Sequence, residues 1–146
     1  MLVLVDEGVP LQVMAPLRLN RGHTFTHVTE LTWGGRKDTE LFASAASRGF
    51  EAIVVLDVDQ LVEPTEWRAL KRSKLHHVSL RQGRTVRGAS GVARVLASLI
   101  VAMPYVLTDL EEADDQQIVE VSLLSATSRH ESFDPRREQA RYPYWR

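Results

Sequence analysis

The chain contains no cysteine. That absence excludes a disulfide framework, a thiolate zinc site and a cysteine nucleophile, and it agrees with a reducing compartment. The N-terminus also lacks the basic start and long apolar stretch of a secretory signal, because residues 2–5 are apolar and Asp6 and Glu7 follow directly. We therefore expect a cytoplasmic protein in which any catalysis uses groups other than thiols.

Long hydrophobic runs are also scarce. The longest runs from Val95 to Leu107 and is interrupted by Ser98 and Pro104, and it is shorter than the ~20 residues needed to cross a bilayer. We expect it to form a buried helix, and we expect no membrane partner. With 146 residues, 44% of them hydrophobic, the chain is long enough for one domain to bury a core without a structural metal.

The net charge of -1 hides a segregation of charge along the chain. Residues 1–66 carry ten acids and five bases, residues 67–108 carry eight bases and no acid, and residues 109–120 carry six acids and no base. A metal-dependent enzyme acting on a polyanion would use carboxylates for the cation and basic side chains for phosphates, although a solvated face is the plainer alternative. The candidate RNA contacts are Arg68, Lys71, Arg72, Arg81, Arg84 and Arg87.

Hydrophobic patterning predicts alternating strands and helices. Strands are expected at residues 1–5, 23–28, 52–56, 75–80 and 117–124, and helices from Pro10 towards Gly22, from Asp38 as N-cap to Gly49, and over 63–72 and 91–110. Pro16 is expected to kink or shorten the first helix. Because parallel neighbours need crossover helices, this order predicts an α/β fold with three layers, α/β/α, around a mainly parallel sheet.

The predicted strands and helices end near residue 124, so residues 1–124 are expected to form the domain. Residues 125–146 carry five arginines and three acids without periodicity. We interpret this segment as an arginine-rich C-terminal tail, disordered by default, with an arm for a partner or a second subunit as the alternative.

Acidic side chains follow two of the predicted strands. Asp6 follows the first strand and Asp57 the third, with Asp59 two residues further on. Carboxyl ends of parallel strands meet at one edge of a sheet, and Asp38 joins them if its helix begins there. Four carboxylates in one cleft raise one another's pKa, and a divalent cation such as Mg²⁺ or Mn²⁺ relieves that repulsion and can activate water beside a phosphodiester.

Each acid also has a plainer explanation. Asp38 could serve only as a helix cap, and Asp57 and Asp59 could begin a turn. Asp6 beside Glu7 at a buried strand end is harder to dismiss, because desolvating an acid without purpose is costly. The joint placement of the acids therefore matters more than any one of them.

Three segments of the first 61 residues stand out: LVDEGVP at 4–10, VTEL with GGRKDTEL between 28 and 41, and VVLDVD at 54–59. Together they resemble a bacterial PIN-like family, and the first segment is similar to its opening LLDENVP. VTEL at 28–31 with GGRKDTEL at 34–41 is similar to its VRELGLGGASDEEI segment, and VVLDVD at 54–59 to its VTRDKDF. The resemblance covers roughly residues 1–61 and keeps the order and spacing of the three segments.

The resemblance implies a PIN-type fold, magnesium-dependent endoribonuclease activity and a role as the toxin of a toxin-antitoxin pair, with RNA as substrate and a cognate antitoxin as partner. It implies that the metal-binding, catalytic acids are Asp6, Asp38, Asp57 and Asp59. Glu7 matches the pattern too. The chain departs from it where Gly8 replaces Asn and where Val55, Leu56 and Val58 replace Thr, Arg and Lys. These departures remove polar neighbours that would help to position metal or phosphate.

Other patterns carry less weight. His23 and His27 would share one face of a strand, but no third ligand is obvious, so structural roles are the alternative to a metal site. Trp33 in a glycine-rich loop could stack on a base or pack over the sheet edge. Gly88 and Gly91 lack the context of a dinucleotide-binding motif.

Two rival functions remain open. A phosphoacceptor receiver domain also places acids after its first and third strands, but it needs a lysine after its fifth strand, and this chain has none beyond Lys74. The second rival is a catalytically degenerate PIN-like module that binds RNA or a protein partner. A homodimer is compatible with either function.

Overall fold

The structure is a computed structural model that describes residues 1–56, 61–80 and 88–125. Its elements, in chain order, are β1 (Leu2–Val5), η1 (Leu11–Val13), α1 (Met14–Leu17), β2 (Thr24–His27), η2 (Val28–Leu31), α2 (Asp38–Ser47), β3 (Ala52–Val55), α3 (Pro64–Ser73), β4 (His76–Leu80), α4 (Gly88–Glu112) and β5 (Ile118–Val121). The strands form one parallel sheet with the order β2-β1-β3-β4-β5.

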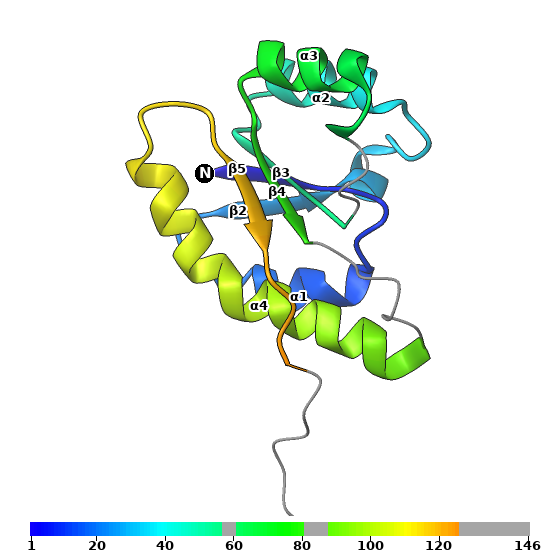
Figure 1. The fold of residues 1–146 in the computed structure, drawn as a ribbon, viewed down its shortest axis with the longest axis vertical. Helices are drawn as coiled ribbons and strands as arrows, with labels where there is room; N and C mark the ends of the chain where they lie inside the picture. The colour runs from blue at the N-terminus through cyan, green and yellow to red at the C-terminus, as the bar shows by residue number, and fades with distance from the viewer. Residues whose placement is uncertain (57–60, 81–87, 126–146) are drawn as a thin grey trace, which may run out of the picture.

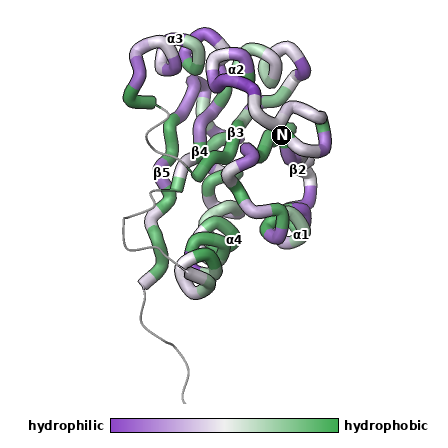
Figure 2. The backbone as a smooth tube through the Cα atoms, turned by 90° about the vertical axis from the view of Figure 1, so that its right-hand side faces the viewer, coloured by the Kyte–Doolittle hydropathy of each residue, from purple (hydrophilic) through white to green (hydrophobic). Residues whose placement is uncertain are grey.

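Helices cover both faces of the sheet, which confirms the predicted three-layer α/β/α fold (Figure 1). Successive strand residues point to opposite faces. Val3 and Val5 pack towards α1 and α4, whereas Leu4 and Ile53 pack towards α2 and α3. Figure 2 shows that α4 is mostly hydrophobic and α3 largely hydrophilic, so the two layers present different surfaces to their surroundings.

The first helical segment is shorter than predicted. A 3₁₀ turn follows Pro10, α1 ends at Leu17, and the chain then turns instead of continuing towards Gly22. Pro16 lies within the first turn of α1, where its missing N–H costs nothing. The side-chain amide of Asn20 donates to the carbonyl of Leu17 at 2.8 Å, closing the end of the helix.

The predicted cap of α2 is wrong by one residue. Lys37 is the N-cap and makes no side-chain capping bond, while Asp38 is the first helical residue. An acid in that first turn still interacts favourably with the positive end of the helix dipole. At the other end Gly49 has a φ of +84°, which glycine adopts without steric cost, and the helix stops there as predicted.

The domain boundary stays a prediction, because residues 126–146 lie outside the described residues. The buried residues nearest the C-terminal side of the described chain are Leu110 in α4 and Val121 in β5, and Leu123 packs against the same core. The hydrophobic core of the described residues therefore lies within the predicted domain.

Candidate functional site

The site begins where β1 and β3 end side by side. Val5 pairs with Val54, and the backbone N–H of Asp6 donates to the carbonyl of Val54 at 3.0 Å. The strand order reverses at β1, because the chain goes next to β2 on one side and later to β3 on the other. Such a switch point opens a crevice at the carboxyl ends of the strands, where ligands bind in doubly wound sheets. Asp6 is the first residue after β1, next to the end of β3 at this switch point.

The carboxylate of Asp6 is partly removed from water. Burial raises its pKa above the usual range, the neighbouring charge of Glu7 adds to that effect, and backbone hydrogen bonds from Gly8 and Glu7 work against it. The bond from Gly8 N to Oδ2 is 3.2 Å long. Because burial disfavours the charged form of this carboxylate, a bound divalent cation would stabilise it. A cation such as Mg²⁺ needs only one or two carboxylates when water fills its other coordination positions.

Glu7 has a role that its sequence position did not indicate. Its Oε2 accepts a hydrogen bond of 2.9 Å from Gly35 N, a residue in the loop that leads to α2. A Cβ on Gly34 would lie 3.2 Å from the same oxygen, so glycine allows the close approach. Glu7 thus ties the end of β1 to the loop before α2.

Asp38 begins α2 and lines a hollow between the first turns of two helices. The hollow has a volume of about 350 Å³ and is lined by Arg36, Lys37, Asp38, Thr39, Thr65 and Glu66. Asp57 and Asp59 lie outside the described residues, so their predicted share in the site is not seen. Within residues 1–56, 61–80 and 88–125, no group of three or more histidines, aspartates or glutamates is placed to hold a metal ion.

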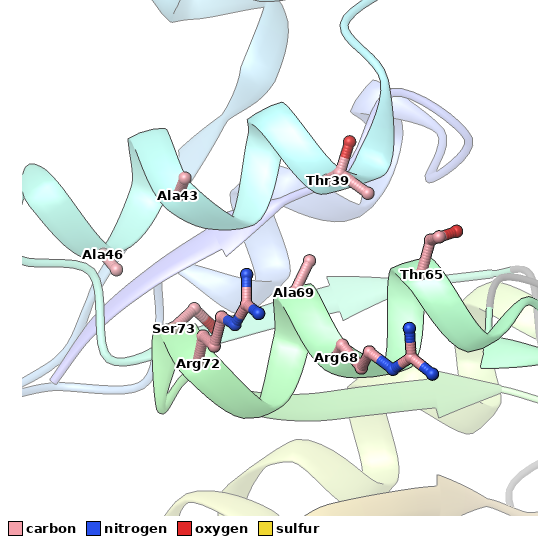
Figure 3. A pocket seen from close by; sticks show the side chains of 8 residues that line it. All are labelled: Thr39, Ala43, Ala46, Thr65, Arg68, Ala69, Arg72 and Ser73. Carbon is pink, nitrogen blue, oxygen red and sulfur yellow. The ribbon is translucent and has the colours of Figure 1, made fainter.

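A groove between α2 and α3 continues from this hollow, since both are lined by Thr39 and Thr65. It has a volume of about 590 Å³. Its other lining residues are Ala43 and Ala46 from α2 and Arg68, Ala69, Arg72 and Ser73 from α3 (Figure 3). Sequence reasoning missed the groove; its signal is the small alanines on the two helices.

The structure separates the predicted RNA contacts. Arg68 and Arg72 are one helical turn apart and both line the groove. Lys71 lines a different hollow of about 170 Å³, together with Gln116 and Ile118. Arg81, Arg84 and Arg87 lie outside the described residues.

His23 and His27, the pair considered as metal ligands, both make contacts within the fold. The ring of buried His27 bonds to the carbonyl of Val9 through Nε2 at 2.9 Å and to Thr29 Oγ1 through Nδ1 at 2.7 Å. His23 lies 3.6 Å from a carboxylate oxygen of Glu111 and 3.4 Å from the N-terminal amine. These contacts favour the structural alternative over a shared metal site.

Trp33 packs into the hydrophobic cluster on the α2 and α3 side of the sheet. Only 8% of its surface is exposed, and the guanidinium groups of Arg36 and Arg48 lie 4.7 and 5.4 Å from its ring centroid. Phe50 makes an edge contact with the same ring. The packing alternative is the one seen, and a base could stack on this ring only by displacing an arginine.

The strand order of this sheet is shared by flavodoxin-like and receiver domains, so the fold alone does not separate those functions from a nuclease. The described residues after β5 contain no lysine, which leaves the receiver alternative without the lysine it needs. No family model, no curated protein and no solved structure matches this chain.

Proposed function

We propose that this protein is a divalent-metal-dependent endoribonuclease that hydrolyses phosphodiester bonds at the carboxyl edge of its sheet. The observation that carries the proposal is the placement of Asp6 at the switch point between β1 and β3. Its carboxylate is partly buried and its pKa is raised by that burial. A partly buried carboxylate with a raised pKa, at a switch point of a parallel sheet, is typical of functional sites.

The chain's own residues have distinct roles in the proposal. Asp6 would hold the cation, with Asp38, Asp57 and Asp59 completing the acidic set implied by the PIN-like resemblance. A bound Mg²⁺ or Mn²⁺ would supply an activated water and stabilise negative charge on the leaving oxygen. Glu7, held by Gly35, keeps the loop before α2 in place against the end of β1.

The groove between α2 and α3 gives the substrate a path to this edge. Arg68 and Arg72 line it, and Arg36 and Lys37 line the hollow that continues it. A row of cations along one groove suits the repeated phosphates of a nucleic-acid strand. The groove leads towards the head of α2, where Asp38 lies.

Cleavage of a labelled single-stranded RNA tests the proposal. We expect Mg²⁺-dependent cleavage that chelation stops, and a rate roughly 100-fold or more lower in Asp6→Asn and Asp38→Asn. Asp114→Asn removes an exposed acid near the opposite edge of the sheet, so its rate should equal that of the wild type. Equal rates for Asp6→Asn and the wild type would contradict the proposal.

The toxin role is part of the same proposal. Expression of the wild-type chain should slow cell growth, and Asp6→Asn should not, while co-expression of a small helix-turn-helix protein from a neighbouring reading frame should restore growth. A toxin of this kind would act on RNA inside the cell, so the proposal includes a cytoplasmic location and RNA as the substrate class. Growth arrest that persists in Asp6→Asn would separate toxicity from the proposed chemistry.

A non-catalytic function is the second candidate. It is favoured by one observation: the described acids do not include a group of three placed around a common metal position. A degenerate module would bind RNA or a protein partner through the groove, with no cleavage at any metal concentration. Its affinity for RNA would be the same in the wild type and Asp6→Asn.

A further inference from the structure

The helix α4 presents an apolar stripe away from the sheet. Its inward side chains, such as Leu99 and Met103, are buried in the core. Its outward side chains are exposed or half-buried and lie at helical spacing: Ala93, Ala97, Ile100, Val101, Pro104 and Tyr105. Val101 is 55% exposed and Tyr105 is 74% exposed. A contiguous apolar surface of this kind marks an interaction site.

The stripe has no charged side chain, but its two ends are charged oppositely. Between Arg94 and Asp109 the chain carries no acid and no base. Arg94 lies near the N-terminal end of α4, which also carries the positive end of the helix dipole. Asp109, Glu111 and Glu112 lie at the C-terminal end. The outer face is therefore positive at one end, apolar in the middle and negative at the other.

We propose that this outer face of α4 pairs with the same face of a second copy of the chain. The two helices run antiparallel, about a two-fold axis near Val101. That arrangement places Arg94 of each copy beside the acids that follow Thr108 in the other. The same axis places the small Ala97 opposite the large Tyr105. A parallel pair would place like charges together at both ends, which is unfavourable.

This pairing is self-complementary, as a two-fold interface requires, because each surface contributes both halves of every contact. It lies on the layer of α1 and α4, across the sheet from the groove between α2 and α3 (Figure 1). The interface is therefore independent of the proposed nuclease chemistry, and either proposal can fail without the other.

A lipid surface is the competing occupant. Among the helices in the described part of the chain, α4 is the one that passes the length and hydropathy criteria for a membrane span, and 39% of its most apolar window is buried in the protein. The buried residues pack against the sheet, and a helix inserted in lipid would have to give up that packing. The end-to-end charge pattern is also better explained by a second helix than by lipid.

Sedimentation of the full chain tests the pairing. At micromolar concentration we expect twice the mass of one chain. Val101→Glu should weaken self-association roughly 30-fold or more, because it places two charges beside the axis. Val62→Glu is the matched control, since Val62 is 72% exposed and lies outside α4. A monomeric wild type, or a Val101→Glu dimer of unchanged affinity, would overturn the proposal.

Charge reversal tests the antiparallel direction. Arg94→Glu should weaken the dimer, and adding Asp109→Arg to the same chain should restore it. Arg94 also donates through Nε to the carbonyl of Leu124, so the restoration, and not the first loss, is the informative result. A double variant as weak as Arg94→Glu alone would overturn the antiparallel arrangement.

The absence of cysteine allows a direct test of register. Under a mild oxidant, a mixture of Ala97→Cys and Tyr105→Cys chains should form the mixed disulfide in preference to either symmetric one. A preference for the symmetric Ala97→Cys product would indicate parallel helices and overturn the proposal. Wild-type chains that bind phosphatidylcholine and phosphatidylglycerol vesicles through α4, without pairing in solution, would overturn it in favour of lipid.

Discussion

Asp6, the proposed metal ligand, lowers the stability of the folded protein at neutral pH. Its raised pKa means that the folded state binds the proton more tightly than the unfolded chain does. Stability therefore falls as pH rises from the ordinary aspartate range through the raised pKa, and the penalty persists above it. A carboxylate kept at such a place suggests a function that repays the cost.

We expect Asp6→Asn to increase the free energy of unfolding at pH 7, because the amide has no charge to desolvate and its oxygen can still accept from Gly8 N. The gain should vanish as pH falls below the usual aspartate pKa. Urea unfolding of both proteins, with EDTA present, measures it. Mg²⁺ should then stabilise the wild type alone; a variant less stable at pH 7 would contradict the prediction.

His77 should act as a point of weakness in acid. It is fully buried in β4, and neither ring nitrogen has a hydrogen-bond partner among the described residues. Desolvation lowers its pKa to about 4. The unfolded chain binds the proton from about pH 6.5 downwards, so the contribution of neutral His77 is complete above that pH and is lost as pH falls towards 4.

The variant His77→Leu isolates this effect. The wild type should lose up to ~1.4 kcal/mol of stability per pH unit between pH 6.5 and 4 from this group, about 3 kcal/mol in total by pH 4. His77→Leu should lose correspondingly less and should match or exceed the wild type at pH 7, because Leu leaves no unpaired polar atom. Urea unfolding across this range is the measurement, and parallel pH profiles would contradict the prediction.

At the scale of elements, patterns within one segment predicted most of the fold. The all-apolar β3 is buried along its length, and the amphipathic spacing after Asp38 gave a helix that starts at that residue. Contacts between distant segments were not predictable in this way. The bond from Gly35 to Glu7 spans 28 residues, and the groove is formed by residues of two separate helices, such as Ala43 of α2 and Ala69 of α3.

The positive side chains of α3 face different surfaces, so their removal should have unequal effects on RNA binding. Arg68 and Arg72 face the groove, whereas Lys71 faces the hollow beside Ile118. If single-stranded RNA follows the groove, Arg68→Ala and Arg72→Ala should each reduce the slope of log affinity against log salt by ~0.7. Lys71→Ala removes one positive charge from the same helix and should change the slope much less.

RNA binding titrated at several salt concentrations measures these slopes. A result in which all three variants behave alike would mean that the protein attracts RNA through its general charge, without a path along the groove. Retained cleavage in Arg68→Ala at low salt would be consistent with the proposal, because the groove serves to hold substrate and not to carry out the chemistry.

At the scale of the whole molecule, two arginines of the basic segment lie on a different layer from three of the acids that follow this segment. The arginine-lined groove belongs to the α2 and α3 layer, and the acids from Asp109 to Glu112 end α4 on the other layer (Figure 1). A net charge of -1 therefore coexists with a basic surface. Such a molecule can attract a polyanion to one side while pairing through the other.

Truncation tests whether the C-terminal segment contributes to folding or to RNA binding. The core of the described residues lies within residues 1–124, so a chain that ends after Ser125 should fold with a similar melting temperature. It would lose five arginines and three acids, a net charge change of -2. Its RNA affinity at low salt should fall, while Mg²⁺-dependent cleavage at saturating RNA should persist, because Asp6 and Asp38 are untouched. A truncated chain that unfolds would instead place residues 126–146 in the fold, and the predicted division at residue 124 would be wrong.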